Sequence, residues 1–211
     1  MSKWLLSEEF LRKSVDELTR LLALSWIHSF VLVGREVLVP YAHSVLGAVL
    51  PSVSSDSTAI REKAIETNSA ISLLIENVGD SGTVNVDTIL QQISLQLRSE
   101  YVNTRLAALR WVSLLHASYP QALEDYLDKM FSILLKMLAD TSEVVTLCLE
   151  VMAKIATNEE YFLKLMTSLI SIFSGDPSLL EKKGSSALRQ LSLYIPPQKV
   201  RWLHRLPSAS L

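Results

Sequence analysis

Histidine and cysteine side chains are the groups in this sequence best suited to metal binding or nucleophilic catalysis. The cysteine is Cys148, and the histidines are His28, His43, His116 and His204. A metal site would need Cys, Asp or Glu at ligand spacing from a histidine, and neither such a cluster nor an H-E-x-x-H motif occurs. The sequence also has no G-x-S-x-G elbow and no glycine-rich phosphate loop. We therefore expect structural histidines, no catalytic residue, no metal and no cofactor.

The thiol and the paired acids also favour structural roles. Cys148 lies in the apolar run VVTLCLEVM without a neighbouring base, which predicts a buried, inert thiol. The adjacent acids Glu8/Glu9 and Glu159/Glu160 would point in different directions on a helix, as solvated or first-turn acids. A single cysteine cannot close an internal disulfide, and no Asn-x-Ser/Thr sequon occurs, so we expect a reducing, cytosolic environment.

The composition predicts a protein that buries most of each helix. Its 211 residues are 49% hydrophobic and 20% charged, and the net charge is −2. A chain so close to neutral has no overall field that would recruit nucleic acid or anionic lipid. The last third is locally basic, through Lys182, Lys183, Arg189, Lys199, Arg201 and Arg205. Two interpretations stay open there: a solvated helix face with a tail, or a patch for an acidic partner or a membrane surface.

Residues 25–54 are strongly apolar and raise the question of a membrane span. Arg35 and Glu36 are the only Asp, Glu, Lys or Arg residues in this segment. The uncharged run before them is about 14 residues long, short of the roughly 20 that cross a bilayer. The run after them is about 19 residues long but contains two prolines, and a single span would place the charged pair at bilayer depth. Two buried helices that meet near Gly34–Pro40 fit better than a direct span.

Apolar residues along the rest of the chain recur every three or four positions, which is the spacing of helices and not of strands. The stripes are Ile60, Ala64, Thr67, Ile71 and Leu74; Leu127, Met130, Leu134 and Leu138; Val144, Cys148, Val151 and Ile155; and Phe162, Met166, Leu169 and Phe173. Trp26, Trp111 and Phe131 fall on such helices and are predicted to be core residues. Because glycine and proline cluster between the stripes, the sequence predicts an all-α fold.

The predicted helices come in pairs that resemble one another. Each pair has an apolar helix end, a short polar turn and a second helix, as in LLKMLADTSEVVTLCLEVM. The turns offer N-capping residues, namely Asp56 or Ser57, Ser99, Thr141 and Asp176. The matching positions Leu50, Leu97, Leu138 and Phe173 are spaced by roughly 35–47 residues, the period of HEAT or armadillo repeats. We expect a HEAT/armadillo-like helical-repeat solenoid of about four helix pairs, which stack into one continuous core.

The repeat pattern divides the chain into five segments. Residues 1–34 are predicted to be N-terminal helices that lead into the array, and residues 35–78 a HEAT-like repeat. Residues 79–85 form a surface loop, because glycine, aspartate, serine and asparagine dominate there. Residues 86–195 are predicted to be further HEAT-like repeats, and residues 196–211 a divergent tail.

Four linked segments carry a more specific resemblance. They are WIHSFVLVGREVLVPYAHSVLGAVLPSVS, TRLAALRW, FSILLKMLADTSEVVTLCLEVMAKIA and YFLKLMTSLISIFSGDPSLLEKKGSSALRQLSLYI. In unbroken order over roughly residues 21–195, they resemble late repeats of the HEAT-repeat vacuole-morphology scaffolds of the PIKfyve-type lipid kinase complex. In the first segment the matching residues are Trp26, Arg35, Leu38, Pro40, Tyr41, Leu46, Ala48, Leu50 and Pro51.

The resemblance implies a non-catalytic scaffold. Members of that family hold a PIKfyve-type phosphatidylinositol 3-phosphate 5-kinase together with an opposing Sac-domain phosphoinositide phosphatase. The resemblance therefore implies that both enzymes are partners, with self-association as a further property. It also implies a cytoplasmic protein that reaches endosomal, lysosomal or vacuolar membranes through these partners. Nucleic acid is not an expected partner.

The resemblance also indicates which residues contact partners and where the sequence departs from the family. Residues 86–195 resemble the phosphatase-binding C-terminal region, and the candidate contact residues are Arg105, Arg110, Glu181 and Arg189. The long N-terminal array used towards the kinase is missing, and the end IPPQKVRWLHRLPSASL does not resemble the family's final helices. A transport adaptor of the HEAT/armadillo class, binding peptides or small GTPases, is the alternative. An electronegative groove or an Asn/Trp ladder would favour that adaptor.

Overall fold

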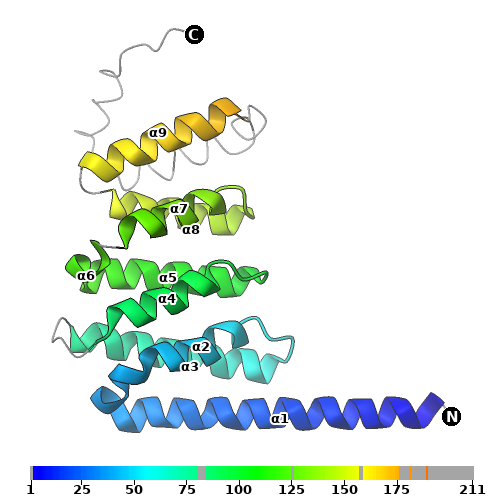
Figure 1. Cartoon of the computed structure of the whole chain (residues 1–211). Helices are drawn as coiled ribbons and strands as arrows, with labels where there is room; N and C mark the ends of the chain where they lie inside the picture. Colours follow the sequence, from blue (N-terminus) through cyan, green and yellow to red (C-terminus); the bar gives the residue numbers. More distant parts are fainter. Residues whose placement is uncertain are drawn as a thin grey trace. The chain divides into compact units, whose positions relative to one another are not determined.

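The computed structural model describes residues 2–79, 84–124, 126–156 and 159–175, together with Glu181 and Arg189 as single residues. These residues form helices joined by short turns and include no strand (Figure 1). The prediction of an all-α helical-repeat fold is therefore confirmed. Most of the predicted loop 79–85, the predicted cap Asp176 and the tail 196–211 lie outside the described residues.

The described chain separates into two compact units, which divide between Tyr126 and Leu127. In the first unit the elements are α1 (Ser2–Gly34), the 3₁₀ helix η1 (Arg35–Tyr41), α2 (Ala42–Ser52), α3 (Thr58–Val78), α4 (Val86–Gln96), α5 (Val102–Ser118) and α6 (Pro120–Glu124). In the second they are α7 (Leu127–Met137), α8 (Ser142–Ile155) and α9 (Glu159–Gly175). The segment 1–34, expected to hold several helices, contains the single helix α1.

The first unit is a stack of antiparallel helix pairs (Figure 1). The two complete pairs are α2 with α3 and α4 with α5, and the helices within each pair contact each other. Between pairs, the first helices α2 and α4 pack together, and so do the second helices α3 and α5. Helix α1 packs along α3 on the side away from α5. The helices α1, α3 and α5 therefore form one layer, against which α2 and α4 pack.

The second helices share one register, which explains how the pairs stack. Counted from the helix start, four buried positions are common to α3, α5 and α8. They are Ile60, Ala64, Thr67 and Ile71 in α3, Thr104, Ala108, Trp111 and Leu115 in α5, and Val144, Cys148, Val151 and Ile155 in α8. The predicted stripes are confirmed with two changes: Ile75 and not Leu74 completes the stripe of α3, and Phe173 at the end of the α9 stripe is only half-buried.

The predicted break near Gly34–Pro40 is present as η1. Arg35 has a positive φ of 43°, and Pro40 lies in the last turn before α2. By length and composition alone, the stretch Asp16–Ser52 is nevertheless apolar enough to cross a membrane, the one such stretch among the described residues. The η1 segment interrupts this stretch between α1 and α2. The expectation that no direct span exists stays a prediction.

Over residues 16–34, where the structure describes its side chains, helix α1 buries one face and exposes the other. Leu24 and Val31 are buried, on the side that packs against α3. A separate stripe of exposed apolar residues on α1 runs through Leu18, Leu22, Trp26, Phe30 and Val33. Trp26 is 63% exposed and stacks at a tilt on Phe30, so its prediction as a core residue is wrong. Trp26 does follow the helical spacing of apolar residues, but no described element covers the face of α1 on which it lies.

The second unit repeats the pair arrangement with α7 and α8, and α9 follows α8 in contact with it. Phe131 and Trp111 are both buried, each in its own unit, as predicted. Cys148 is also buried, and its thiol donates to the carbonyl of Leu134 at 3.2 Å. Burial raises the pKa of this thiol well above its usual range, so the reactive thiolate is suppressed.

Replacing a leucine by alanine should destabilise the protein much more on the buried face of α1 than on its exposed face. Leu24 is 4% exposed and Leu22 is 52% exposed on the same helix. Leu24→Ala leaves a cavity against α3 and should lower the free energy of unfolding by about 2–4 kcal/mol. Leu22→Ala should change it by less than about 1 kcal/mol. Urea titration followed by circular dichroism measures both, and equal losses would contradict the assigned faces of α1.

The buried thiol predicts slow modification in the folded protein. Cys148 is the only cysteine of the chain, so a thiol reagent such as dithionitrobenzoate reports on this site alone. We expect the reaction to be at least about 100-fold slower in buffer than in 6 M guanidinium chloride, because the second unit must open first. Comparable rates under both conditions would show that the pair α7/α8 does not protect the thiol.

Candidate binding groove

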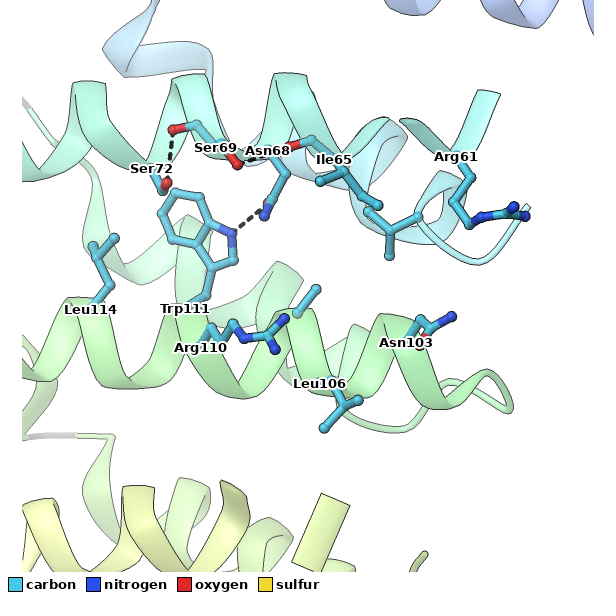
Figure 2. A pocket seen from close by; sticks show the side chains of 12 residues that line it. Arg61, Ile65, Asn68, Ser69, Ser72, Asn103, Leu106, Arg110, Trp111 and Leu114 are labelled. Atoms are coloured by element: carbon cyan, nitrogen blue, oxygen red, sulfur yellow. Dashed lines mark hydrogen bonds between the residues drawn. The ribbon is translucent and has the colours of Figure 1, made fainter. Parts of the chain in front are cut away.

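A groove runs between the second helices α3 and α5 of the first unit (Figure 2). It has a volume of about 430 Å³. The wall from α3 presents Arg61, Ile65, Asn68, Ser69 and Ser72, and the wall from α5 presents Asn103, Leu106, Ala107, Arg110, Trp111 and Leu114, with Val53 completing the lining. These side chains converge because the helices are in register and are neighbours in the stack.

A hydrogen bond at the base of the groove joins its two walls. The indole Nε1 of Trp111 donates to Oδ1 of Asn68 at 2.8 Å (Figure 2). Trp111 is only 2% exposed, so its ring supports the groove from below and offers little surface to a ligand. The bond uses the acceptor of the Asn68 amide and leaves the NH₂ group of that amide as a donor.

Three further hydrogen bonds, two of them buried, fix α5 against the preceding pair. The hydroxyl of Tyr119 donates to the carbonyl of Ile75 at 2.7 Å, at the C-terminal ends of α3 and α5. At the N-terminal end of α5, Oγ1 of Thr104 donates to the carbonyl of Leu50 at 3.2 Å, and its N–H donates to Oγ of Ser54 at 3.0 Å. Because α5 is held at its start, middle and end, the groove is formed before any ligand binds.

Arg61 is held in place by the turn of its own repeat. Its Nη1 donates to the carbonyl of Ser55 at 2.7 Å, and its Nη2 donates to Oγ1 of Thr58 at 3.1 Å. Arg105 occupies the equivalent position of the next repeat. Its Nη1 donates at 2.8 Å to the carbonyls of both Ser99 and Glu100. In both repeats an arginine of the second helix therefore closes the turn, where the sequence predicted serine or aspartate caps.

The capping predictions are right in position for two of the described helices. Ser57 and Thr141 are the N-cap residues of α3 and α8, but neither side chain makes a capping hydrogen bond. The N-cap of α5 is Tyr101, while Oγ of Ser99 accepts from the Tyr101 N–H at 3.3 Å.

The four predicted contact residues occupy different environments. Arg110 is exposed and lines the groove. Arg105 is half-buried on the same helix, where it closes the turn, and it is not part of the lining. Glu181 and Arg189 are exposed, and they are single described residues whose neighbours in the chain lie outside the described part. A partner contact for any of the four stays a prediction.

Sequence reasoning missed Arg61, Ile65 and Asn103 as groove residues. Arg61 carried a usable signal, because IREKAI and TRLAAL place an arginine at the same distance from the helix start. No local pattern marks Ile65 or Asn103, since each becomes a groove residue only when α3 and α5 lie side by side. Ile65 is 50% exposed and gives the groove an apolar wall.

The groove is equipped for recognition and not for acid–base chemistry. None of its twelve lining residues is Asp, Glu, His or Cys, while two are arginine. It is thus not electronegative, and its tryptophan is buried, so it has neither feature that would favour the transport adaptor. Among the described residues no group of three or more His, Cys, Asp or Glu side chains could hold a metal ion.

A second hollow, of about 1000 Å³, lies between α1 and α3 and has mixed charge. His28, Arg35, Glu36 and Glu66 line it. The pKa of Glu66 lies below its usual value, because the ammonium of Lys63 binds its carboxylate. His28 is half-buried there, and Nε2 of the half-buried His43 shares a hydrogen bond of 3.0 Å with the hydroxyl of Ser44. The Nδ1 atom of each histidine is buried without a hydrogen-bond partner among the described residues, so a structural role for either stays a prediction.

The buried tyrosine at the end of the groove gives a matched stability test. Tyr119→Phe removes the donor to the Ile75 carbonyl and should lower the free energy of unfolding by about 1–2 kcal/mol. Tyr41→Phe, at a site that is 59% exposed, should leave it within about 0.5 kcal/mol. Denaturant titration of both variants measures the difference. Equal stabilities would show that the hydrogen bond does not hold α5.

Comparison with known proteins identifies the repeat type and its relatives. Residues 20–159 match the family model described as "Stalled ribosome sensor GCN1-like, HEAT repeats". The Protein VAC14 homolog of Arabidopsis thaliana is 38% identical over 89% of this chain. Vacuole morphology and inheritance protein 14 of Saccharomyces cerevisiae is 25% identical over 86%, and the VAC14 homolog of Schizosaccharomyces pombe is 28% identical over 84%. No solved structure matches the chain significantly.

The matches cover most of this chain but only part of each relative. The chain spans 25% of the length of the Arabidopsis protein, 21% of the budding yeast protein and 24% of the fission yeast protein. The family model covers the stacked pairs α2/α3 and α4/α5, whose second helices form the groove, and also α7/α8. The chain therefore belongs to the HEAT-repeat family, and within that family it is VAC14-like.

Proposed function

We propose that this chain is a non-catalytic scaffold of the phosphatidylinositol 3,5-bisphosphate pathway. The observation that carries the proposal is its similarity to VAC14 homologues over most of its length. Fold alone would not carry it, because helical-repeat folds serve many unrelated functions. The printed name of the budding yeast relative refers to vacuole morphology and inheritance, which fits a role at the vacuole or endosome.

The finer proposal names the proteins that the scaffold assembles. They are a PIKfyve-type lipid kinase and a Sac-domain phosphoinositide phosphatase, as the sequence resemblance implies. These partners would bring the chain to endosomal, lysosomal or vacuolar membranes. Self-association of the chain is a further part of this proposal.

The groove supports a binding role in this scaffold. Stacked helical repeats present extended surfaces to partner proteins, and the layer of second helices is such a surface. Its walls are joined by the Trp111–Asn68 hydrogen bond, so little conformational entropy is lost when a partner binds. The lining offers arginine and amide donors beside apolar side chains, which is a composition suited to protein contacts.

Co-purification from cell extract tests the proposal. The full chain, carrying an affinity tag, is expected to retain the Sac-domain phosphatase, which immunoblotting or mass spectrometry would identify. Circular dichroism of the eluted chain establishes that it is folded. A folded chain that retains neither the phosphatase nor the lipid kinase would refute the proposal for this chain. Retention of small GTPases or transport receptors in their place would favour the transport adaptor.

A further inference from the structure

We propose that the groove between α3 and α5 binds an extended acidic peptide segment, in which carboxylates alternate with aliphatic side chains. The inference rests on the proposed scaffold function and specifies the chemistry of the partner segment that the scaffold would hold. Its basis is the charge, the hydrogen-bonding groups and the apolar walls of the groove.

Charge complementarity is the first argument. The two arginines lie on opposite walls, Arg61 on α3 and Arg110 on α5, and no acidic residue lines the space around them (Figure 2). The whole chain has a net charge of −2, so this positive groove is a local feature. Guanidinium groups bind carboxylates with paired hydrogen bonds, which makes the groove complementary to an acidic segment.

The guanidinium groups of Arg61 and Arg110 differ in the hydrogen bonds that they already make. Arg61 is anchored through the Ser55 carbonyl and the Thr58 hydroxyl, so its guanidinium is already ordered. Arg110 is exposed, and within the described part of the chain its guanidinium makes no hydrogen bond or ion pair. An arriving carboxylate could therefore bind Arg110 without displacing an existing partner.

The amide groups extend the donor character of the groove. The Asn68 oxygen is occupied by Trp111, so the NH₂ group of Asn68 is the part of that amide left for a ligand. Asn103 adds a second amide at the α5 wall and is exposed. The hydroxyls of Ser69 and Ser72 donate to backbone carbonyls within α3, so each keeps only its oxygen as an acceptor. The N–H groups of Arg110 and of the two amides outnumber these acceptors, which favours a ligand rich in carbonyl and carboxylate oxygens.

The apolar walls favour a peptide over a small anion. Ile65 is half exposed and Leu106 and Leu114 are half-buried along the same groove. A phosphate group would engage the arginines and leave these side chains in water. A segment with aliphatic residues next to its carboxylates would cover them and gain roughly 25 cal/mol for each Å² of apolar surface removed from water.

Selection of peptides from a random library tests this assignment with purified protein. A phage-displayed library of 12-residue peptides is selected on the folded full chain, and the recovered peptides are synthesised with a fluorescent label. We expect enrichment of Asp and Glu beside Leu, Ile or Val. In fluorescence anisotropy, Arg110→Glu should weaken binding at least about 10-fold, since it replaces attraction by repulsion. Arg110→Gln, which only removes the charge, should give a smaller loss.

Arg98→Glu is the matched control, because Arg98 is exposed in the turn after α4 and lies outside the lining. It should change affinity less than about twofold, although it alters the net charge by the same amount. Recovery of peptides without acidic enrichment, or equal binding by the Arg110 and Arg98 variants, would overturn the proposal. So would binding to vesicles with anionic phosphoinositides, abolished by Arg110→Glu, where no peptide binds.

The experiments distinguish failure of the groove assignment from failure of the proposed scaffold function. If Arg110→Glu loses the selected peptides but the chain never retains the phosphatase or the kinase, the groove assignment stands and the scaffold function fails. If both enzymes are retained but the peptides show no dependence on Arg110, the scaffold function stands and the groove assignment is overturned.

Discussion

Three polar contacts, made by Thr104 and Trp111 of α5 and by Tyr119 directly after it, hold the first unit in the arrangement on which its groove depends. Thr104 and Trp111 are about two helical turns apart, so they point to the same side of α5. The three residues bond to the Leu50 carbonyl, the Asn68 side chain and the Ile75 carbonyl. Apolar packing alone tolerates small slips between helices, but a slip of α5 would leave buried polar atoms unpaired. Each unpaired group costs about 1–3 kcal/mol, so the register is specified by chemistry as well as by shape.

The same register is built from different side chains in the second unit. Where α5 has Thr104 and Trp111, α8 has Val144 and Val151, and its one polar side chain in the equivalent stripe is the Cys148 thiol. That thiol bonds to Leu134 in α7, the first helix of the same pair. The contacts of α5 to α2 and α3, in contrast, cross between pairs. The two units thus share a repeat pattern, but the second unit joins α9 to the α7/α8 pair through an exposed ion pair, in which Lys164 of α9 binds Asp128 of α7.

The sequence predicted most of the helices and their buried faces, but it did not predict the groove. Helical spacing located the stripes of α3, α7, α8 and α9 because burial of one helix face leaves a local pattern. That pattern does not record whether a neighbour covers the face, which is why Trp26 looked like a core residue and is exposed. The groove depends on α3 and α5 lying side by side, and no single segment encodes that contact. Arg105 shows the same limit, since only the folded turn reveals that its guanidinium binds the Ser99 and Glu100 carbonyls.

Charge segregation across α3 explains how a slightly acidic chain can present a cationic groove. Towards α5 the helix presents Arg61 and no acid, whereas towards α1 it presents Glu66 in a hollow of mixed charge that also contains Arg35 and Glu36. Lys63 binds the Glu66 carboxylate, so that acid is partly neutralised on its own side of the helix. Interactions between exposed charges are screened over about 8 Å at physiological ionic strength. A partner in the groove would therefore respond mainly to Arg61 and Arg110, and much less to the net charge of the chain.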